Sequence, residues 1–196
     1  MIVNILLFND FETLDVFGPV EVLGRVAGYE LKYVSWSGGV VKSRQGTMIL
    51  TGNLNDMDKN GILLVPGGQG TRPLVQETEF IADLREAAAA SCWCLTVCTG
   101  AALLAVTGLL DGLQATSNKK AFSWVVSVNE AVNWQPKARW CVAGKYYTAS
   151  GVSAGIDMAL GFVADRFGNS VAESIAENIE YIWHDKKQED PFAVKA

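Results

Sequence analysis

The residue best placed for chemistry in this sequence is Cys98, which follows an apolar run. The run CWCLTV ends at Val97, and the small-residue segment TGAALLAV begins directly after the cysteine. This pattern predicts a buried strand that turns sharply into a helix at Cys98. The free N–H groups and the dipole of a helix N-terminus stabilise a thiolate, so this corner would make Cys98 a nucleophile. The alternative interpretation is a core cysteine, because free cysteine is among the most buried residue types.

A cysteine nucleophile needs a partner that moves protons. Asp15 lies in LDVFGP, where apolar neighbours on both sides make an unpaired carboxylate costly. An N-cap of the following helix is an equally good interpretation of Asp15. The only histidine, His184, lies near the C-terminus in IWHDKKQED, a setting more typical of a surface residue than of a catalyst.

A glycine-rich loop, PGGQG, follows the apolar run GILLVP. If this loop faces the Cys98 corner, the backbone N–H groups of Gly68 and Thr99 would be placed to bind an oxyanion. The loop has neither the GxxxxGK[ST] nor the GxGxxG spacing, so we expect no nucleotide.

Strands and helices alternate for most of the chain, which predicts an α/β fold with a mainly parallel sheet. In such sheets ligands bind beyond the carboxyl ends of the strands, where the loops carrying Asp15, Gly68 and Cys98 would meet.

We expect Pro19 to be tolerated only in the first turn of its helix. The segment 37–52 predicts a small antiparallel hairpin. The expected strands cover 2–8, 31–36, 61–66, 92–97, 138–142 and 146–148, and the expected helices 14–26, 77–90, 156–167 and 171–183, with one more after Cys98.

Composition narrows the classes of partner. The chain has 196 residues with a formal net charge of −5 and no gathering of Lys and Arg, which argues against nucleic acid. No uncharged apolar span of 18 residues occurs and no signal peptide opens the chain, so we expect no membrane and a cytoplasmic location. One histidine and no paired CxxC motifs argue against a zinc site, and four cysteines fit a reducing compartment. We find no linker or repeat and expect one domain over 1–196.

Five segments, in order along the chain, resemble the ThiJ/PfpI superfamily and within it the isonitrile hydratase branch. The resemblance implies a flavodoxin-like three-layer α/β sandwich related to class I glutamine amidotransferases, a homodimer and a reactive cysteine at a nucleophile elbow. The segments are LDVFGPVEVL, ILLVPGGQGTR, VCTGAALLAVTGLLDGLQAT, SGVSAGIDMAL and EYIWHDKKQEDPF.

The resemblance also assigns roles to individual residues. It places the elbow nucleophile at Cys98 and its acidic partner at Asp15, an aspartate as in isonitrile hydratases. Thr99 follows the nucleophile, again as in that branch, and its N–H with that of Gly68 matches the oxyanion site. Gly151 in SGVSAG would approach the sulfur.

Departures from other branches exclude some activities. The peptidase branch carries histidine after the cysteine, where this chain has Thr99, which argues against peptidase activity. The regulator branch appends a helix-turn-helix domain, and this sequence ends at Ala196, which argues against DNA binding.

Two classes of function compete. In the first, the protein is a lyase without cofactor or metal: Cys98 attacks the terminal carbon of an isonitrile, Asp15 relays a proton, and water releases an N-formamide. The same residues would also suit a glyoxalase-type reaction on a reactive carbonyl. In the second, the protein is a non-catalytic redox or stress-response protein with an oxidisable Cys98. Asp15 and Thr99 together favour the enzyme.

Overall fold

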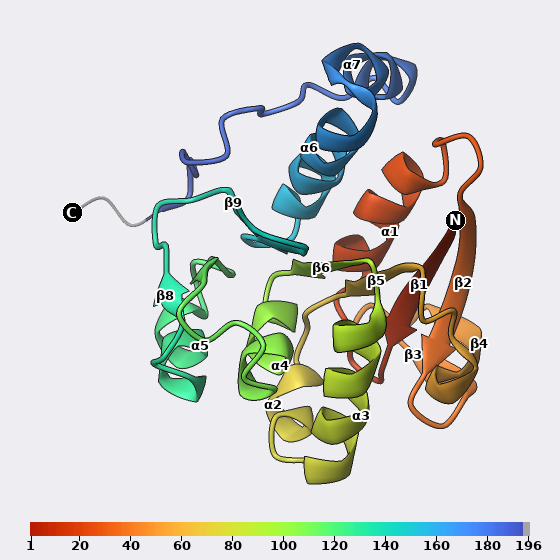
Figure 1. The fold of residues 1–196 in the computed structure, drawn as a ribbon, viewed down its shortest axis with the longest axis vertical. Coiled ribbons are helices and arrows are strands. Elements are labelled where there is room, and N and C mark those ends of the chain that lie inside the picture. The colour runs from red at the N-terminus through yellow and green to blue at the C-terminus, as the bar shows by residue number, and fades with distance from the viewer. Residues whose placement is uncertain (194–196) are drawn as a thin grey trace.

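Eight strands form one twisted sheet in the computed structural model, which describes residues 1–193 (Figure 1). Their order across the sheet is β3-β4-β2-β1-β5-β6-β10-β9. The strands are β1 Ile2–Leu7, β2 Glu30–Ser35, β3 Gly39–Lys42, β4 Met48–Asn53, β5 Ile62–Val65, β6 Trp93–Val97, β9 Trp140–Ala143 and β10 Tyr146–Ala149. Two short strands, β7 Gln114–Ala115 and β8 Asn133–Trp134, pair separately.

The six central strands, from β4 to β10 in this order, run parallel. The two outer strands, β3 and β9, run antiparallel to their neighbours. Residues at the carboxyl ends lie in register, with Val97 of β6 opposite Ala149 of β10. The expected mainly parallel sheet and the expected hairpin, with Val40 opposite Leu50, are both confirmed.

Helices cover both faces of the sheet and complete the three layers (Figure 1). One face carries α1 Thr13–Leu23, α6 Ala154–Phe167 and α7 Asn169–Asn178. The other carries α2 Thr71–Leu74, α3 Thr78–Ala90, α4 Gly100–Val106 and α5 Phe122–Val128, and a 3₁₀ turn, η1, spans Leu54–Asp56.

The central strands are buried on both sides, as their continuous apolar runs predicted. All four residues of β5 are fully buried, and so are Val3 and Ile5 of β1. The core therefore lies on both faces of β1, β5 and β6, the strands whose carboxyl ends lead into the candidate site.

The structure corrects the expectation for Pro19. It lies in the middle of α1, which begins at Thr13, rather than in the first turn. Proline has no N–H, so the Asp15 carbonyl loses its helical donor at this point. Pro19 is buried against α6, where a side chain at Gly155 would come within 3.1 Å of its Cγ.

The last helix is shorter than predicted, and α5 was not predicted at all. Helix α7 ends at Asn178, and the segment 179–193 crosses the fold as a tail. Buried Asp157 holds this tail: its Oδ1 accepts from the Tyr181 hydroxyl at 3.0 Å and from the His184 N–H at 3.0 Å. These tertiary hydrogen bonds replace the helical ones that the pattern predicted.

Candidate functional site

Cys98 occupies a strained turn between β6 and α4. Its φ of +55° lies in the left-handed region that residues other than glycine rarely adopt. Its N–H donates to the carbonyls of Ala149 at 3.2 Å and Ser150 at 3.0 Å, which ties the turn to the end of β10. Glycine is required at position 100, since any side chain there would collide with the carbonyls of Val65 and Pro66. The fold thus holds a cysteine elbow at the carboxyl edge of the sheet.

Asp15 reaches the elbow from the first turn of α1 and is completely buried. Its Oδ2 accepts a hydrogen bond from the Gly67 N–H at 2.9 Å. A Cβ at Gly67 would lie 2.5 Å from the Thr99 nitrogen and 2.9 Å from this oxygen. Glycine at position 67 is therefore what lets α1, the β5 loop and the elbow converge. The Cys98 thiol lies within hydrogen-bonding reach of the Asp15 carboxyl.

The electrostatics of this pair favour its protonated form. Burial raises the pKa of Asp15 to about 8, although the hydrogen bonds from Gly67 and Cys98 lower it in part. Among residues 1–193, nothing donates a hydrogen bond to Asp15 Oδ1. Burial, and secondly the Asp15 charge, also raise the pKa of the Cys98 thiol, while the N–H groups of Thr99 and Val152 oppose this rise. Both shifts favour a thiol beside a carboxylic acid, whereas the helix terminus alone would favour a thiolate.

Thr99 and Gly68 both line the Cys98 cavity, but within residues 1–193 only one of their two N–H groups is free to bind an oxyanion. The Gly68 N–H already donates to Thr99 Oγ1 at 3.0 Å. The Thr99 N–H points toward the Cys98 sulfur, where it stabilises negative charge.

Gly151 lies in an adjoining cavity of about 470 Å³ that shares Asn118, Lys120 and Val152 with the Cys98 cavity. It is the next residue, Val152, whose N–H reaches the sulfur. His184 is exposed on the C-terminal tail and does not line the Cys98 cavity.

The Cys98 cavity has a volume of about 430 Å³, which suits a small molecule. Sequence reasoning missed most of its wall, because the wall comes from separate loops that only the tertiary fold assembles. Of the missed residues, Gln69, Arg72 and Val152 belong to motifs that the sequence singled out. The lining residues are Glu12, Arg44, Gly68, Gln69, Arg72, Cys98, Thr99, Asn118, Lys120, Ala121 and Val152.

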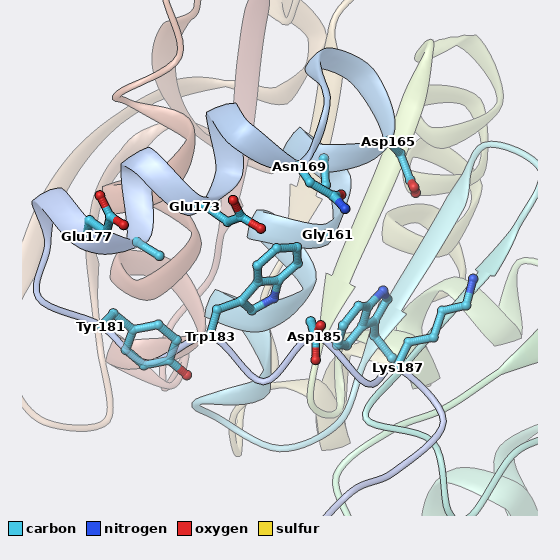
Figure 2. A pocket seen from close by; sticks show the side chains of 12 residues that line it. Gly161, Asp165, Asn169, Glu173, Glu177, Tyr181, Trp183, Asp185 and Lys187 are labelled. Atoms are coloured by element: carbon cyan, nitrogen blue, oxygen red, sulfur yellow. The ribbon is translucent and has the colours of Figure 1, made fainter.

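A separate cavity of about 500 Å³ lies between α6, α7 and the C-terminal tail (Figure 2). Figure 2 shows the Trp183 ring near its centre, with the carboxylates of Glu173 and Asp185 beside it. Its lining contains no cysteine, serine or histidine. The nucleophile therefore identifies the Cys98 cavity as the candidate active site.

Within the described range 1–193, no cluster of three or more His, Cys, Asp or Glu side chains is arranged to hold a metal ion. In the same range, no helix has the length and apolar character needed to cross a bilayer.

Comparison with known proteins identifies relatives of this chain in sequence and in fold. The DJ-1/PfpI family model matches residues 1–165. The isonitrile hydratase of Pseudomonas putida is 30% identical over 181 residues, covering 91% of this chain and 78% of that protein. A ThiJ/PfpI family protein from Pseudomonas syringae superposes with a TM-score of 0.84 at 26% identity, over 100% of this chain and 78% of that one. Drosophila melanogaster DJ-1beta shares the fold, with a TM-score of 0.78 at 19% identity, over 93% of this chain and 98% of that one.

Proposed function

The chain belongs to the DJ-1/PfpI family, and we propose that within it the protein is a cysteine-dependent lyase that hydrates an isonitrile to an N-formamide. The observation that carries this proposal is the buried pair of a Cys98 thiol and an Asp15 carboxyl on a strained elbow. The similarity to an isonitrile hydratase over 91% of the chain supports it.

The first step adds sulfur and hydrogen to one carbon. Cys98 Sγ forms a bond to the terminal carbon of the isonitrile while the Asp15 carboxyl gives that carbon its proton. The thiol proton passes to Asp15, so the carboxyl is restored. The product is a thioformimidate, R–N=CH–S–Cys98, and nothing has been oxidised or reduced. A carboxyl with a pKa of about 8 suits this step, because it holds its proton at neutral pH.

The second step is hydrolysis of this intermediate. Water adds to the C=N carbon, the nitrogen takes up a proton, and the C–S bond then breaks. The sulfur leaves as a thiolate, takes a proton through Asp15 and returns to the resting thiol. The N–H groups of Thr99 and Val152 stabilise the departing sulfur, since both lower the pKa of Cys98.

Loss of the isonitrile infrared band and appearance of the N-formamide by NMR measure the reaction. We expect Cys98→Ser to abolish turnover, and Cys92→Ser, at an exposed cysteine outside the cavity, to retain it. Mass spectrometry after an acid quench should detect the Cys98 adduct. Full turnover by Cys98→Ser with the fold intact would end the proposal.

The raised pKa of Cys98 also bears on whether the protein is a redox sensor instead of an enzyme. Peroxide oxidises the thiolate form of cysteine, and the raised pKa of Cys98 disfavours that form. The site therefore fits a redox sensor less well than an enzyme. A reactive carbonyl such as a glyoxal remains the alternative electrophile, and turnover of glyoxals without isonitriles would select it.

A further inference from the structure

Three cationic side chains surround the cavity that contains Cys98. Arg44 comes from the turn after β3, Arg72 from α2, and Lys120 from the loop before α5. Glu12 is the only carboxylate among the lining residues. This local excess of positive charge occurs in a chain whose formal net charge is −5.

The protein itself does not neutralise these cations. Over residues 1–193, none of the three has a carboxylate within 4.0 Å, although seven ion pairs form elsewhere. Glu12 is engaged by another group, since its Oε1 accepts from Gln45 Nε2 at 2.6 Å. Asp15 adds little negative charge at neutral pH, because burial keeps it protonated.

Arg72 is also fixed in position. Its Nη1 donates to the Gly68 carbonyl at 3.0 Å and to Thr71 Oγ1 at 3.2 Å. Its guanidinium stacks 4.3 Å from the centre of the Trp124 ring. In the described part of the chain its Nε and Nη2 donors have no partner, and a planar guanidinium fork matches a carboxylate.

We propose that the substrate carries a carboxylate of its own, which Arg72 binds with Arg44 and Lys120 while the electrophilic carbon faces Cys98. This inference rests on the proposed function for the identity of the electrophile, but the charge preference belongs to the cavity. The cavity volume of about 430 Å³ admits a small acid together with its reacting group.

Alkylation tests the charge preference without any isonitrile. Iodoacetate and iodoacetamide differ by one charge and react with cysteine by the same displacement. The ratio of their rate constants is measured at Cys98 and at exposed Cys92 of the same chain by peptide mapping. We expect the iodoacetate-to-iodoacetamide ratio to be on the order of tenfold higher at Cys98 at low salt, and to shrink as salt screens the cations.

Charge-removing variants locate the effect. Arg72→Gln and Arg44→Gln should each move the Cys98 ratio toward the Cys92 ratio. Lys59→Gln, which removes an exposed cation paired with Glu86 away from the cavity, should leave it unchanged. Equal ratios at the two cysteines would overturn the proposal. If the raised pKa of Cys98 makes its alkylation too slow to measure, the turnover of charged and uncharged substrates decides the charge preference.

Turnover gives a second measurement. Isocyanoacetate and its methyl ester present the same isonitrile with and without the charge, and we expect kcat/KM to be on the order of tenfold higher for the acid. An ester that reacts equally well overturns the charge preference and leaves the lyase proposal standing. If neither compound is turned over, the lyase proposal is contradicted. The alkylation ratios then decide the charge preference alone.

Discussion

Replacing Asp15 with asparagine should change how the stability of the protein depends on pH. The pKa of Asp15 is raised from its ordinary value of 3.8 to about 8, and the residue is completely buried. Between these two values the folded chain holds a proton at Asp15 that the unfolded chain has released. This contribution to stability is therefore complete below pH 3.8 and is lost as pH rises through about 8.

The size of the effect follows from the width of this window. Each pKa unit corresponds to about 1.4 kcal/mol, so ionising Asp15 would cost the folded state about 6 kcal/mol in full. Between pH 5 and pH 7 alone, the free energy of unfolding should fall by about 3 kcal/mol more in the wild type than in Asp15→Asn. The asparagine oxygen can keep the Gly67 hydrogen bond, so the variant should fold.

Urea unfolding at pH 5, 6 and 7 measures this difference directly. The two proteins differ by one nearly isosteric side chain, so the other titrating groups cancel in the comparison. The free energy of unfolding of the variant minus that of the wild type should grow by about 1.4 kcal/mol per pH unit. Parallel pH profiles would mean that Asp15 is already ionised in the folded protein, and the acid role proposed for it would be refuted.

Three further changes follow from the packing around the site and the tail. Gly67→Ala should lose most activity and unfold at a lower temperature, because its Cβ would lie 2.5 Å from the Thr99 nitrogen; thermal unfolding and kcat measure this. Thr99→Val removes the acceptor of the Gly68 N–H and should cost about 1–3 kcal/mol in urea unfolding, whereas Thr99→Ser should not. Asp157→Ala removes the 2.8 Å partner of buried Arg139, which keeps its 3.6 Å contact with Asp190, and should cost about 1–3 kcal/mol. Proteolysis of the tail should also be faster, and an unchanged cleavage rate would contradict the anchoring role of Asp157.

The sequence predicted the parts of the fold that local patterns determine. Continuous apolar runs indicated β1, β5 and β6 because each is buried on both faces. The hairpin of β3 and β4 followed from glycines around two short apolar strands. The predicted parallel sheet placed the loops carrying Asp15 and Cys98 at the same edge, and the family resemblance supplied their roles as acidic partner and nucleophile.

Other elements depend on contacts that no local pattern encodes. The segment FSWVVSV forms α5, although its β-branched residues and aromatics are typical of a strand. The residues after Asn178 have an apolar spacing compatible with a helix, yet Asp157, some twenty residues earlier, draws them into the tail. The cations at the cavity were missed for the same reason, since they are brought together only by the folded loops.

The protonation state of the Cys98 and Asp15 pair depends on more than the helix terminus that the sequence indicates. The N–H groups of Thr99 and Val152 lower the pKa of Cys98, whereas burial and the neighbouring Asp15 raise it. A site that holds a thiol and a carboxylic acid is poor for attack by a free thiolate. It suits a reaction that must place sulfur and hydrogen on the same carbon, and addition to the terminal carbon of an isonitrile has this requirement. The raised pKa values therefore support the same chemistry that an activated thiolate was expected to provide, by a different route.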